Sequence, residues 1–498
     1  MNMFKGHHML ILGLGDSGLA MARWCAWQGA EVTVVDTRAN PPGWQILQDE
    51  GLPVTFKSQA MDDTLLAGQP VHGVFKSPGL SPAEVAPVWQ AAKAQGIWVG
   101  TELSLFAHAL VQLKSSDPAY QPQVLAITGT NGKTTVTRLT GLLLERAGKD
   151  VAVAGNIGPT LLDTLRTRWA QLPQVWVLEL SSFQLDEVTD FEPTAACLLN
   201  ITQDHLDWHT DMAAYAQAKA NVWGKHGVGV LPKHDPAVMA WWPQDSSDKK
   251  AVPRPRIGFG PDEPQTAGDF GLSTINGMTW LVRAAPSEEP VSKRAKPSDE
   301  PLHLQRLMPA DALRIRGQHN ALNALAALAL ASTCSTGLAP LLHGLREYPG
   351  EPHRLSSVAI VNDIEYVDDS KGTNVGATVA AINSLGMDRQ LVVILGGEGK
   401  GQDFSPLIEP VARHARAVVL MGRDAAQVGE TLRINGVEQH MATDMQQAVR
   451  IATQAARAGD LVLLSPACAS LDMYANYVAR AGAFVEAVTE LAHGEGNA

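Results

Sequence analysis

The sequence predicts an α/β protein with three domains, and three observations lead to that fold class. Short apolar runs of strand length alternate with helix-like stretches along the whole chain, a pattern typical of parallel sheets covered by helices. Two of these runs end in glycine-rich turns that open helices, at residues 13–18 and 129–132. The 498 residues also exceed what one hydrophobic core accommodates, so the chain should divide into several domains.

The first segment, residues 1–114, begins with a strand at 9–12, a glycine turn, and a helix at 19–27. A second strand at 31–35 ends on Asp36. The spacing Gly13-x-Gly15-x-x-Gly18 followed by an acidic residue is a Rossmann-like dinucleotide fingerprint. The turn itself indicates only that a helix N-terminus can receive a diphosphate, which a UDP-sugar carries as well as NAD does.

The second segment, residues 115–350, follows a polar stretch at 114–122 that we interpret as a linker. Further strands are expected at 151–154, 175–179 and 195–200, and a helix at 321–331. Asn276-Gly277 predicts a two-residue hairpin turn between strands at 271–275 and 278–282. Residues 284–301 are rich in proline and charge, and we predict a disordered surface insertion there.

The third segment, residues 351–498, follows a proline- and glycine-rich stretch around residue 350. Its apolar runs predict strands at 358–361, 391–395, 417–421 and 461–464, separated by helix-like stretches. The segment therefore forms a third α/β domain of ordinary size, again Rossmann-like.

Composition narrows the class of protein further. The chain is 45% hydrophobic and 18% charged, as in an ordinary globular protein, and its net charge of −12 disfavours nucleic acid or an anionic membrane as a partner. Its 4 cysteines are far apart, which argues against a disulfide framework or a zinc site. No run approaches the roughly 20 apolar residues of a membrane span, and the first apolar run is too short for a signal sequence. We expect a cytoplasmic monomer.

The turn at 129–132 carries the clearest chemistry, because Lys133 and Thr134 follow it at the start of a helix. Glycines allow backbone N–H groups to surround phosphate oxygens, while lysine reaches the terminal phosphates and threonine can bind Mg²⁺. Ile127 stands where the standard P-loop has its first glycine, so this is a shortened variant. The motif predicts a nucleoside triphosphate site in a central P-loop domain.

Two nucleotide sites on one chain suit a kinase or a ligase that uses a nucleotide-activated substrate. A nicotinamide-dependent oxidoreductase is the main alternative from another reaction class, although nothing downstream of residue 36 supplies a clear hydride-transfer site. A non-catalytic protein that binds a nucleoside triphosphate for regulation is a third possibility.

Nine short motifs in this order resemble the Mur ligase family of bacterial cell-wall synthesis, and the resemblance covers nearly the whole chain outside 284–301. They are TGTNGKT at 128–134, GNIG at 155–158, LELSSFQL at 178–185, DHLD at 204–207, GQHN at 317–320, PHR at 352–354, DSKGTN at 369–374, GGEGK at 396–400 and SPACAS at 465–470. The last four, with residues 36–38, favour the branch that adds D-glutamate over its siblings, which add other amino acids.

The resemblance implies an ATP- and Mg²⁺-dependent amide ligase that joins D-glutamate to UDP-N-acetylmuramoyl-L-alanine through an acyl phosphate. It implies that the first domain binds the UDP-substrate, the central domain ATP, and the third the amino acid. The physical problem in such a reaction is negative charge, so the site needs cations and positioning more than covalent help from the protein.

The resemblance also assigns roles to single residues. Lys133, His205 and Lys219 are the implied catalytic residues. The implied metal ligands are Thr134, Glu179, His205 and Lys219, the last as a carbamylated lysine. The implied ATP contacts are Gly129, Thr130, Asn131, Gly132, Lys133, Thr134, Thr135, Asn320, Asn323, Arg354, Asp369 and Lys371. The implied UDP-substrate contacts are Gly15, Asp16, Ser17, Asp36, Thr37, Arg38, Asn156, Ser182 and Gln184. The implied D-glutamate contacts are Thr373, Lys400, Ser470 and Tyr477.

Two positions depart from the family's pattern. Glu398 stands where aspartate is usual, and its longer side chain can shift a nearby contact. Asp16 replaces an apolar residue, and a carboxylate beside a UDP diphosphate is unfavourable unless it faces the uracil or solvent. Without the resemblance, Lys219 would be interpreted as a solvated helix lysine.

Overall fold

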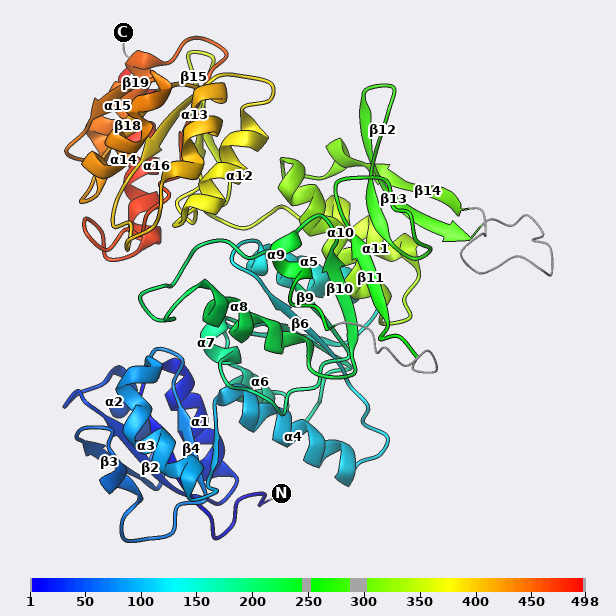
Figure 1. Cartoon of the computed structure of the whole chain (residues 1–498), viewed down its shortest axis with the longest axis vertical. Helices are drawn as coiled ribbons and strands as arrows, with labels where there is room; N and C mark the ends of the chain where they lie inside the picture. The colour runs from blue at the N-terminus through cyan, green and yellow to red at the C-terminus, as the bar shows by residue number, and fades with distance from the viewer. Residues whose placement is uncertain (1, 244–251, 287–301, 496–498) are drawn as a thin grey trace.

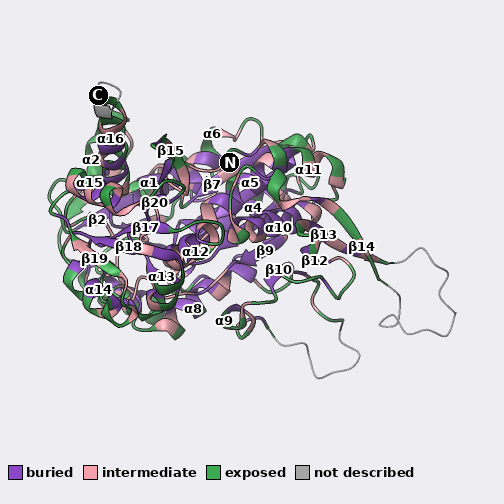
Figure 2. Ribbon diagram, turned by 90° about the horizontal axis from the view of Figure 1, so that it is seen from above, coloured by how far each residue is buried: buried purple, intermediate pink, exposed green. Residues whose placement is uncertain are grey.

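Three sheets, one from each third of the chain, follow one another along the long axis of the molecule (Figure 1). The computed structural model describes residues 2–243, 252–286 and 302–495. Buried residues fill the strands and the helices packed on them (Figure 2). The predicted α/β class with three sheets is confirmed, while the domain limits at 114 and 350 stay predictions.

The first sheet has five parallel strands in the order β3-β2-β1-β4-β5. This is a Rossmann-like arrangement, in which the strand order reverses beside β1 and opens a crevice at the carboxyl ends of the strands. The elements are β1 (His8–Leu12), α1 (Asp16–Trp27), β2 (Glu31–Asp36), α2 (Pro42–Asp49), β3 (Val54–Ser58), β4 (Gly73–Lys76), α3 (Pro82–Ala94), β5 (Trp98–Gly100) and α4 (Glu102–Ser116).

The central sheet has nine strands in the order β14-β13-β12-β11-β10-β9-β6-β8-β7. The strands from β7 to β12 are parallel, and β13 and β14 continue the sheet antiparallel. The strands are β6 (Gln123–Thr128), β7 (Val151–Gly155), β8 (Val175–Glu179), β9 (Ala195–Leu198), β10 (Val228–Pro232), β11 (Arg256–Phe259), β12 (Phe270–Ile275), β13 (Met278–Pro286) and β14 (Leu302–Pro309). The helices are α5 (Lys133–Arg146), α6 (Leu161–Thr167), α7 (Ser182–Leu185), α8 (Met212–Ala220), α9 (Pro236–Met239), α10 (Gln318–Ser332) and α11 (Leu338–Glu347).

The third sheet has six strands in the order β15-β16-β20-β17-β18-β19, and only β15 is antiparallel to its neighbour. Its central strands are continuous apolar runs because helices cover both faces. The elements are β15 (Ser356–Val361), β16 (Ile364–Asp368), α12 (Val375–Leu385), β17 (Leu391–Leu395), α13 (Ile408–His414), β18 (Ala415–Leu420), α14 (Ala425–Leu432), β19 (Glu438–Met441), α15 (Met445–Ala455), β20 (Leu461–Leu464) and α16 (Tyr477–Glu495).

The hairpin predicted at Asn276-Gly277 is confirmed. Strands β12 and β13 pair antiparallel with Ile275 opposite Met278, and both turn residues have positive φ, as a tight two-residue turn of this hand requires. The predicted insertion at 284–301 is wrong at its start, since residues 284–286 complete β13 and pair with β14. Alternation of apolar and polar residues was too weak there to reveal a strand. The rest of that prediction, 287–301, lies outside the described residues.

Helix α4 belongs structurally to both of the first two sheets. Its residues share one apolar cluster with α1 and with the central strands, and the Phe106 ring meets the Trp176 ring edge-on at 5.0 Å between centroids. A second link between these sheets is the buried Lys76 ammonium, which bonds Asp186 at 2.8 Å. The predicted linker is therefore shorter than expected, because α4 continues to Ser116.

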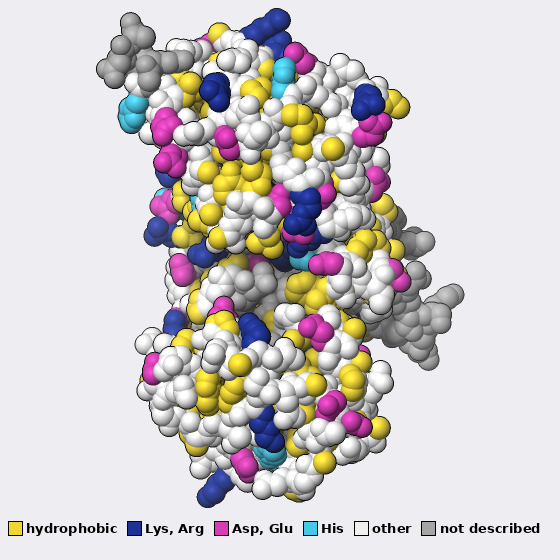
Figure 3. All heavy atoms as spheres, turned by 90° about the vertical axis from the view of Figure 1, so that its left-hand side faces the viewer, with side chains coloured by type: hydrophobic (Ala, Val, Ile, Leu, Met, Phe, Trp, Pro, Cys, Tyr) yellow, Lys and Arg dark blue, Asp and Glu magenta, His cyan; other side chains and the backbone are white. Residues whose placement is uncertain are grey.

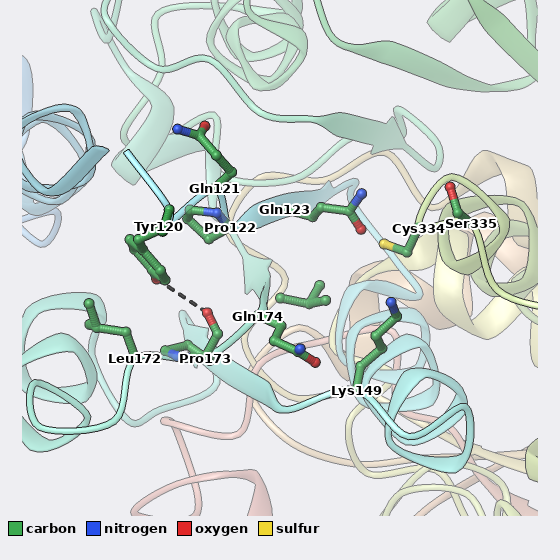
Figure 4. Close-up of a pocket in the computed structure, with 12 residues that line it drawn as sticks. Tyr120, Gln121, Pro122, Gln123, Lys149, Leu172, Pro173, Gln174, Cys334 and Ser335 are labelled. Carbon is green, nitrogen blue, oxygen red and sulfur yellow. Dashed lines mark hydrogen bonds between the residues drawn. The ribbon is translucent and has the colours of Figure 1, made fainter. Parts of the chain in front are cut away.

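The linker after α4 leads into β6 and is held there by side-chain hydrogen bonds. The Tyr120 hydroxyl accepts from the Trp176 indole N–H at 3.0 Å and donates to the Pro173 carbonyl at 3.2 Å (Figure 4). A cavity of about 390 Å³ opens there, lined by amides, Lys149 and Cys334 (Figure 4). It lies at the amino ends of β6 and β8, so it is at the opposite end of the sheet from the predicted phosphate turn.

The domain that contains the third sheet contacts the central domain through hydrogen bonds. These bonds join residues that precede the connection near residue 350 to residues that follow it. His319 Nδ1 lies 2.7 Å from Ser384 Oγ, and the Arg316 guanidinium donates to Glu365 at 2.9 Å. Glu365 also accepts from Arg389 of its own domain at 2.8 Å. None of the helices in the described part of the chain is long and apolar enough to cross a membrane.

Glu102, at the start of α4, yields a prediction for stability against pH. The side chain is fully buried, Oε1 accepts from the Leu162 backbone N–H at 2.9 Å, and burial raises the pKa of Glu102 to about 7. Between the unfolded pKa and 7, the folded protein keeps a proton that the unfolded chain has released. The contribution of Glu102 to the free energy of unfolding is therefore fully present below the unfolded pKa, and it is lost as pH rises through 7.

We expect Glu102→Gln to gain stability relative to the wild type as pH rises from about 4.5 to 7. Urea midpoints measured at several pH values test this. Glu145→Gln, an exposed carboxylate on α5, is the matched control and should show no such trend. A Glu102→Gln difference that stays constant with pH would contradict the prediction.

Candidate active site

The site forms where three neighbouring strands of the central sheet end. Strand β6 lies between β8 and β9, with Ile127 opposite Glu179 and Thr128 opposite Leu198. Parallel strands bring their carboxyl ends to the same edge, where ligands bind in open α/β sheets. The phosphate turn after β6, Glu179 and the loop after β9 therefore meet.

The phosphate turn has the conformation that the sequence predicted. Gly129 and Gly132 adopt φ of 155° and 84°, and Gly132 is the N-cap of α5. A Cβ on Gly132 would lie 2.7 Å from Asn323 Oδ1, and the positive φ would strain any other residue at this position. The backbone N–H groups of the first α5 turn consequently face an open space suited to an anion.

Two lysine side chains share one carbonyl oxygen beneath this turn. Lys133 Nζ and Lys219 Nζ each donate to the Gly129 carbonyl at 2.8 Å. Burial, and then the nearby Lys133 charge, place the pKa of Lys219 well below its ordinary value. Burial also lowers the pKa of Lys133. The helix lysine that sequence alone would have left in solvent is therefore buried, and its burial disfavours the charged form.

Glu179 provides the test of whether Mg²⁺ fits here. Its side chain is buried, Oε1 accepts from Asn156 Nδ2 at 2.7 Å, and Oε2 has no hydrogen-bond partner in the structure. An unpaired buried carboxylate oxygen is costly unless a cation balances it. In the described part of the chain, no cluster of three or more His, Cys, Asp and Glu side chains gathers as a metal site. The residues fit a Mg²⁺ that takes part of its oxygen ligands from phosphates.

His205 lies in a loop with φ of 55°, and its ring sits within an aromatic group. The Phe183 ring meets it edge-on at 4.8 Å, and Tyr215 lies 6.4 Å away. Burial lowers the pKa of His205, and burial also lowers the pKa of His209, next to it in this group, to about 4. Burial thus disfavours the charged form of both rings, and a neutral imidazole can bind a metal.

Two adjoining cavities collect most of the predicted residues. The larger, of about 570 Å³, lies between the central and third domains, and the smaller, of about 250 Å³, lies beside the start of α10. Figure 3 shows the molecule hollowed at mid-height, with Lys and Arg side chains at the rim. Predicted residues that line the larger cavity are Thr130, Asn131, Gly132, Lys133, Thr134, Asn156, Glu179, Ser182, His205, Lys219, Arg354, Lys371, Thr373, Lys400 and Tyr477. Those that line the smaller are Asn131, Gly132, Thr135, Asn320, Asn323, Arg354, Asp369 and Lys371.

The third domain supplies further cations to the larger cavity. The Arg354 guanidinium donates to Thr134 Oγ1 at 3.0 Å, which places it over the phosphate turn. Lys371 Nζ lies 4.0 Å from the centre of the Tyr477 ring, and burial, followed by Arg354, lowers the pKa of Lys371 to about 8. Burial raises the pKa of Asp369 to about 7, and its Oδ2 accepts from Ser465 Oγ at 2.7 Å.

The remaining predicted D-glutamate contacts differ in their surroundings. Lys400 is exposed with φ of 52°, whereas Ser470 is buried and lines neither cavity. Glu398 points away, since its carboxylate pairs with Arg423 at 2.7 Å. The departure from aspartate at 398 is thus accommodated by an ion pair outside the cavity.

The predicted UDP-substrate contacts of the first domain lie together at the carboxyl ends of β1 and β2. Asp36 is buried and accepts from the Leu14 N–H and from the Arg38 N–H and guanidinium. Burial opposes ionisation, but these bonds hold the pKa of Asp36 at about 2. Its carboxylate therefore positions Arg38 and the glycine turn. Asp16 and Thr37 are exposed, which lets Asp16 face solvent.

Three predicted UDP-substrate contacts, Gln184, Gly15 and Ser17, line neither cavity. Gln184 is buried, lines neither cavity, and accepts through Oε1 from the Ser181 backbone N–H at 3.0 Å as part of a helix cap. Its role as a substrate contact stays a prediction. Gly15 and Ser17 begin α1 and also lie outside both cavities.

Asn200 received no site role in the sequence analysis, and Asn374 and Asp204 stood in its motifs without a role of their own. Asn200 Oδ1 accepts from the Asn131 N–H at 2.8 Å, and its Nδ2 donates to the Asn131 carbonyl at 3.1 Å. Asn131 and Asn374 exchange side-chain amide hydrogen bonds at 3.1 Å, and Asn374 Nδ2 also donates to Asp204 at 3.2 Å. The available signal for Asn200 was a polar residue just past a strand beside β6. Asn374 ends the DSKGTN motif, but no local pattern indicated its contact with Asn131.

The site combines a P-loop, cations from two domains and a crevice in the first domain that suits an anion. These features define a class of enzyme that binds a nucleoside triphosphate and brings charged substrates to it. Family models agree with this class. The Mur ligase MurD-like N-terminal domain matches residues 7–101, the Mur ligase middle domain residues 127–254, and the Mur ligase glutamate ligase domain residues 353–468. The chain belongs to the Mur ligase family.

Known relatives indicate which member of the family this chain is similar to. The UDP-N-acetylmuramoylalanine–D-glutamate ligase of Albidiferax ferrireducens is 58% identical, over 100% of this chain and 99% of that protein. Among solved structures, the UDP-N-acetylmuramate–alanine ligase MurC of Thermotoga maritima has a TM-score of 0.54 at 18% identity, covering 97% and 99% of the two chains. The MurF ligase of Thermotoga maritima in complex with ADP has a TM-score of 0.56 at 14% identity, covering 99% and 96%. The two structures support the fold.

Lys133→Ala tests the phosphate turn. Removing the cation that reaches the terminal phosphates should lower kcat by about 100- to 1000-fold or more, because the transferring phosphoryl group loses its main charge partner. Steady-state phosphate release measures this. Lys149→Ala, at the opposite end of the sheet, is the control and should retain activity. Wild-type turnover in Lys133→Ala would remove the turn from the site.

Lys219→Ala tests whether this lysine carries a carboxylate in the active protein. A neutral buried amine reacts with CO₂, and the carbamate would supply an anionic oxygen ligand. We expect the variant to lose most activity and to regain part of it when short carboxylic acids such as acetate are added. The exposed Lys225→Ala serves as control. Full activity in Lys219→Ala would exclude Lys219 from the site.

Proposed function

We propose that this protein is an ATP-dependent ligase that joins D-glutamate to UDP-N-acetylmuramoyl-L-alanine. The observation that carries the proposal is the 58% identity, over both full lengths, to a ligase of that name. The ADP in the related MurF structure supports ATP as the phosphoryl donor. We further propose that the protein acts in the cytoplasm as a monomer.

The reaction has two steps that the cavity can accommodate. A carboxylate oxygen of the UDP-substrate attacks the γ-phosphorus of ATP, the bond to the β-phosphate oxygen breaks, and ADP and an acyl phosphate result. The D-glutamate nitrogen then attacks the acyl carbon, loses a proton, and inorganic phosphate leaves from the tetrahedral intermediate. Both steps bring anions together, so their barrier falls when fixed cations surround the transferring group.

The chain's own cations fit those two steps. Lys133 and the N–H groups at the start of α5 would hold the terminal phosphates, and Arg354 would reach the same phosphates from the third domain. A planar guanidinium suits phosphate oxygens because it donates two parallel hydrogen bonds. The smaller cavity, with Asn320, Asn323 and Asp369, would receive the nucleoside.

Mg²⁺ would be held by Thr134 and Glu179, and a second ion by His205 and a carbamylated Lys219. When bound, Mg²⁺ neutralises part of the phosphate charge during transfer. Asn156 would keep the Glu179 carboxylate oriented through its 2.7 Å hydrogen bond. The unpartnered Oε2 of Glu179 supports this assignment.

The amino acid would enter from the third domain. D-glutamate carries two carboxylates, and Lys371, Lys400, Thr373 and Tyr477 line that side of the larger cavity. Ser470 would approach one carboxylate from behind Ala469, which does line the cavity. At the other end, Arg38 and the start of α1 would hold the uridine diphosphate, with Ser182 nearer the reacting carboxylate.

Phosphate release from ATP with UDP-N-acetylmuramoyl-L-alanine tests the proposal. We expect release with D-glutamate and at most about a hundredth of it with L-glutamate, L-lysine or meso-diaminopimelate, since a pocket that leaves polar groups unpaired discriminates strongly. Release with another of these amino acids would indicate a sibling ligase. No release with any would return a regulatory nucleotide-binding protein or an oxidoreductase to consideration, and NAD binding by the protein would separate those two.

A further inference from the structure

His209 has no role in the reaction described above, although its ring contacts Ser182, which lines the larger cavity. It follows the DHLD motif, and its backbone N–H donates to the His205 carbonyl at 2.9 Å. Its side chain is only 4% exposed, and its ring Nε2 lies 3.0 Å from the Ser182 hydroxyl oxygen. This is the one hydrogen bond that the structure gives to the Ser182 side chain within the described residues.

Neighbouring rings fix the orientation of the His209 ring. The Trp208 ring lies 4.5 Å away, Tyr215 meets it edge-on at 5.2 Å, and Phe183 stacks at 5.8 Å between centroids. A buried ring held on several sides cannot turn its nitrogen away from Ser182 without disturbing this packing. The contact is therefore a fixed feature of the cavity wall.

The direction of this hydrogen bond decides what Ser182 can do. A hydroxyl has one proton and two lone pairs, so it can donate to only one group at a time. If Nε2–H donates to Ser182 Oγ, the hydroxyl proton remains free to point into the cavity that Ser182 lines. If instead Ser182 donates to Nε2, the cavity meets only an acceptor, which would repel a carboxylate.

We propose that His209 is a positioning residue, whose Nε2–H donates to Ser182 and thereby directs the Ser182 hydroxyl proton onto an oxygen of the UDP-substrate beside its reacting carboxylate. The inference rests on the proposed function, since it assigns that substrate to this side of the cavity. It gives the chain a substrate contact formed by a pair of side chains that are 27 residues apart.

His209→Leu and His209→Gln test the pair. Leucine removes the donor, whereas the glutamine amide N–H can take the place of Nε2–H. We expect His209→Leu to raise KM for the UDP-substrate about tenfold, the value of one hydrogen bond, with KM for ATP unchanged. His209→Gln should recover most of the loss. A rise in both KM values, or no recovery with glutamine, would overturn the proposal, because a purely structural ring predicts those results.

A double-mutant cycle shows whether His209 acts through Ser182. Ser182→Ala should raise the same KM, and adding His209→Leu should then have little further effect, since the two share one interaction. Full additivity would overturn the inference. His414→Leu is the matched control, because this buried histidine also makes one ring hydrogen bond, to the Gly386 carbonyl at 2.8 Å, but lies remote from the cavity. Wild-type ligase activity, measured alongside, reports separately on the proposed function.

Discussion

The Gly129 carbonyl oxygen accepts hydrogen bonds from both Lys133 and Lys219, and much of the site depends on that shared contact. It holds two buried nitrogen atoms beneath a turn that must receive a polyphosphate. Two ammonium groups so close together repel each other, and this repulsion lowers their pKa values. The pKa of Lys219 is lowered well below its ordinary value, and burial is the main cause. Of the nearby anions, Glu179 ends strand β8, and Asp204 lies in the loop that follows β9.

This arrangement follows from strand order rather than from any single motif. Placing β6 between β8 and β9 brings Glu179 and Asn200 to the phosphate turn from either side. The third domain then contributes Arg354 and Asn374 from across the connection. The first domain is joined to the central one through α4 and through Lys76 and Asp186. One cavity can thus draw charges from elements that are far apart in sequence.

The sequence was sufficient for the parts of the structure that rest on local rules. The phosphate turn, the Asn276-Gly277 hairpin and the apolar strands of the third sheet all follow from glycine geometry and side-chain periodicity. Hydrogen bonds between distant residues were beyond such rules. Asn374 meets Asn131 across 243 positions, and burial of Lys219 depends on packing that a helix pattern does not reveal.

Local patterns also cannot tell which polar atoms are already used. Gln184 and Asp36 stand at positions where the resemblance implies ligand contacts, yet each has hydrogen-bond partners within the protein. Asp36 acts on Arg38, and Gln184 on the cap of α7. Residue identity alone therefore does not tell whether such a side chain contacts a ligand or supports a neighbour; its hydrogen-bond partners in the fold are needed for that.

The amide pair of Asn131 and Asn374 has a consequence for turnover. Both groups are uncharged, and each can exchange its partner for water with nearly the same number of hydrogen bonds, so the joint is weak in net free energy. It carries no charge for salt to screen and no proton for pH to remove. A ligase whose cavity lies between two domains must also let its products leave in every cycle. This amide pair therefore aligns the two domains at the phosphate turn and adds little to the free energy that holds them together, unlike the charged Arg316–Glu365 contact between the same domains.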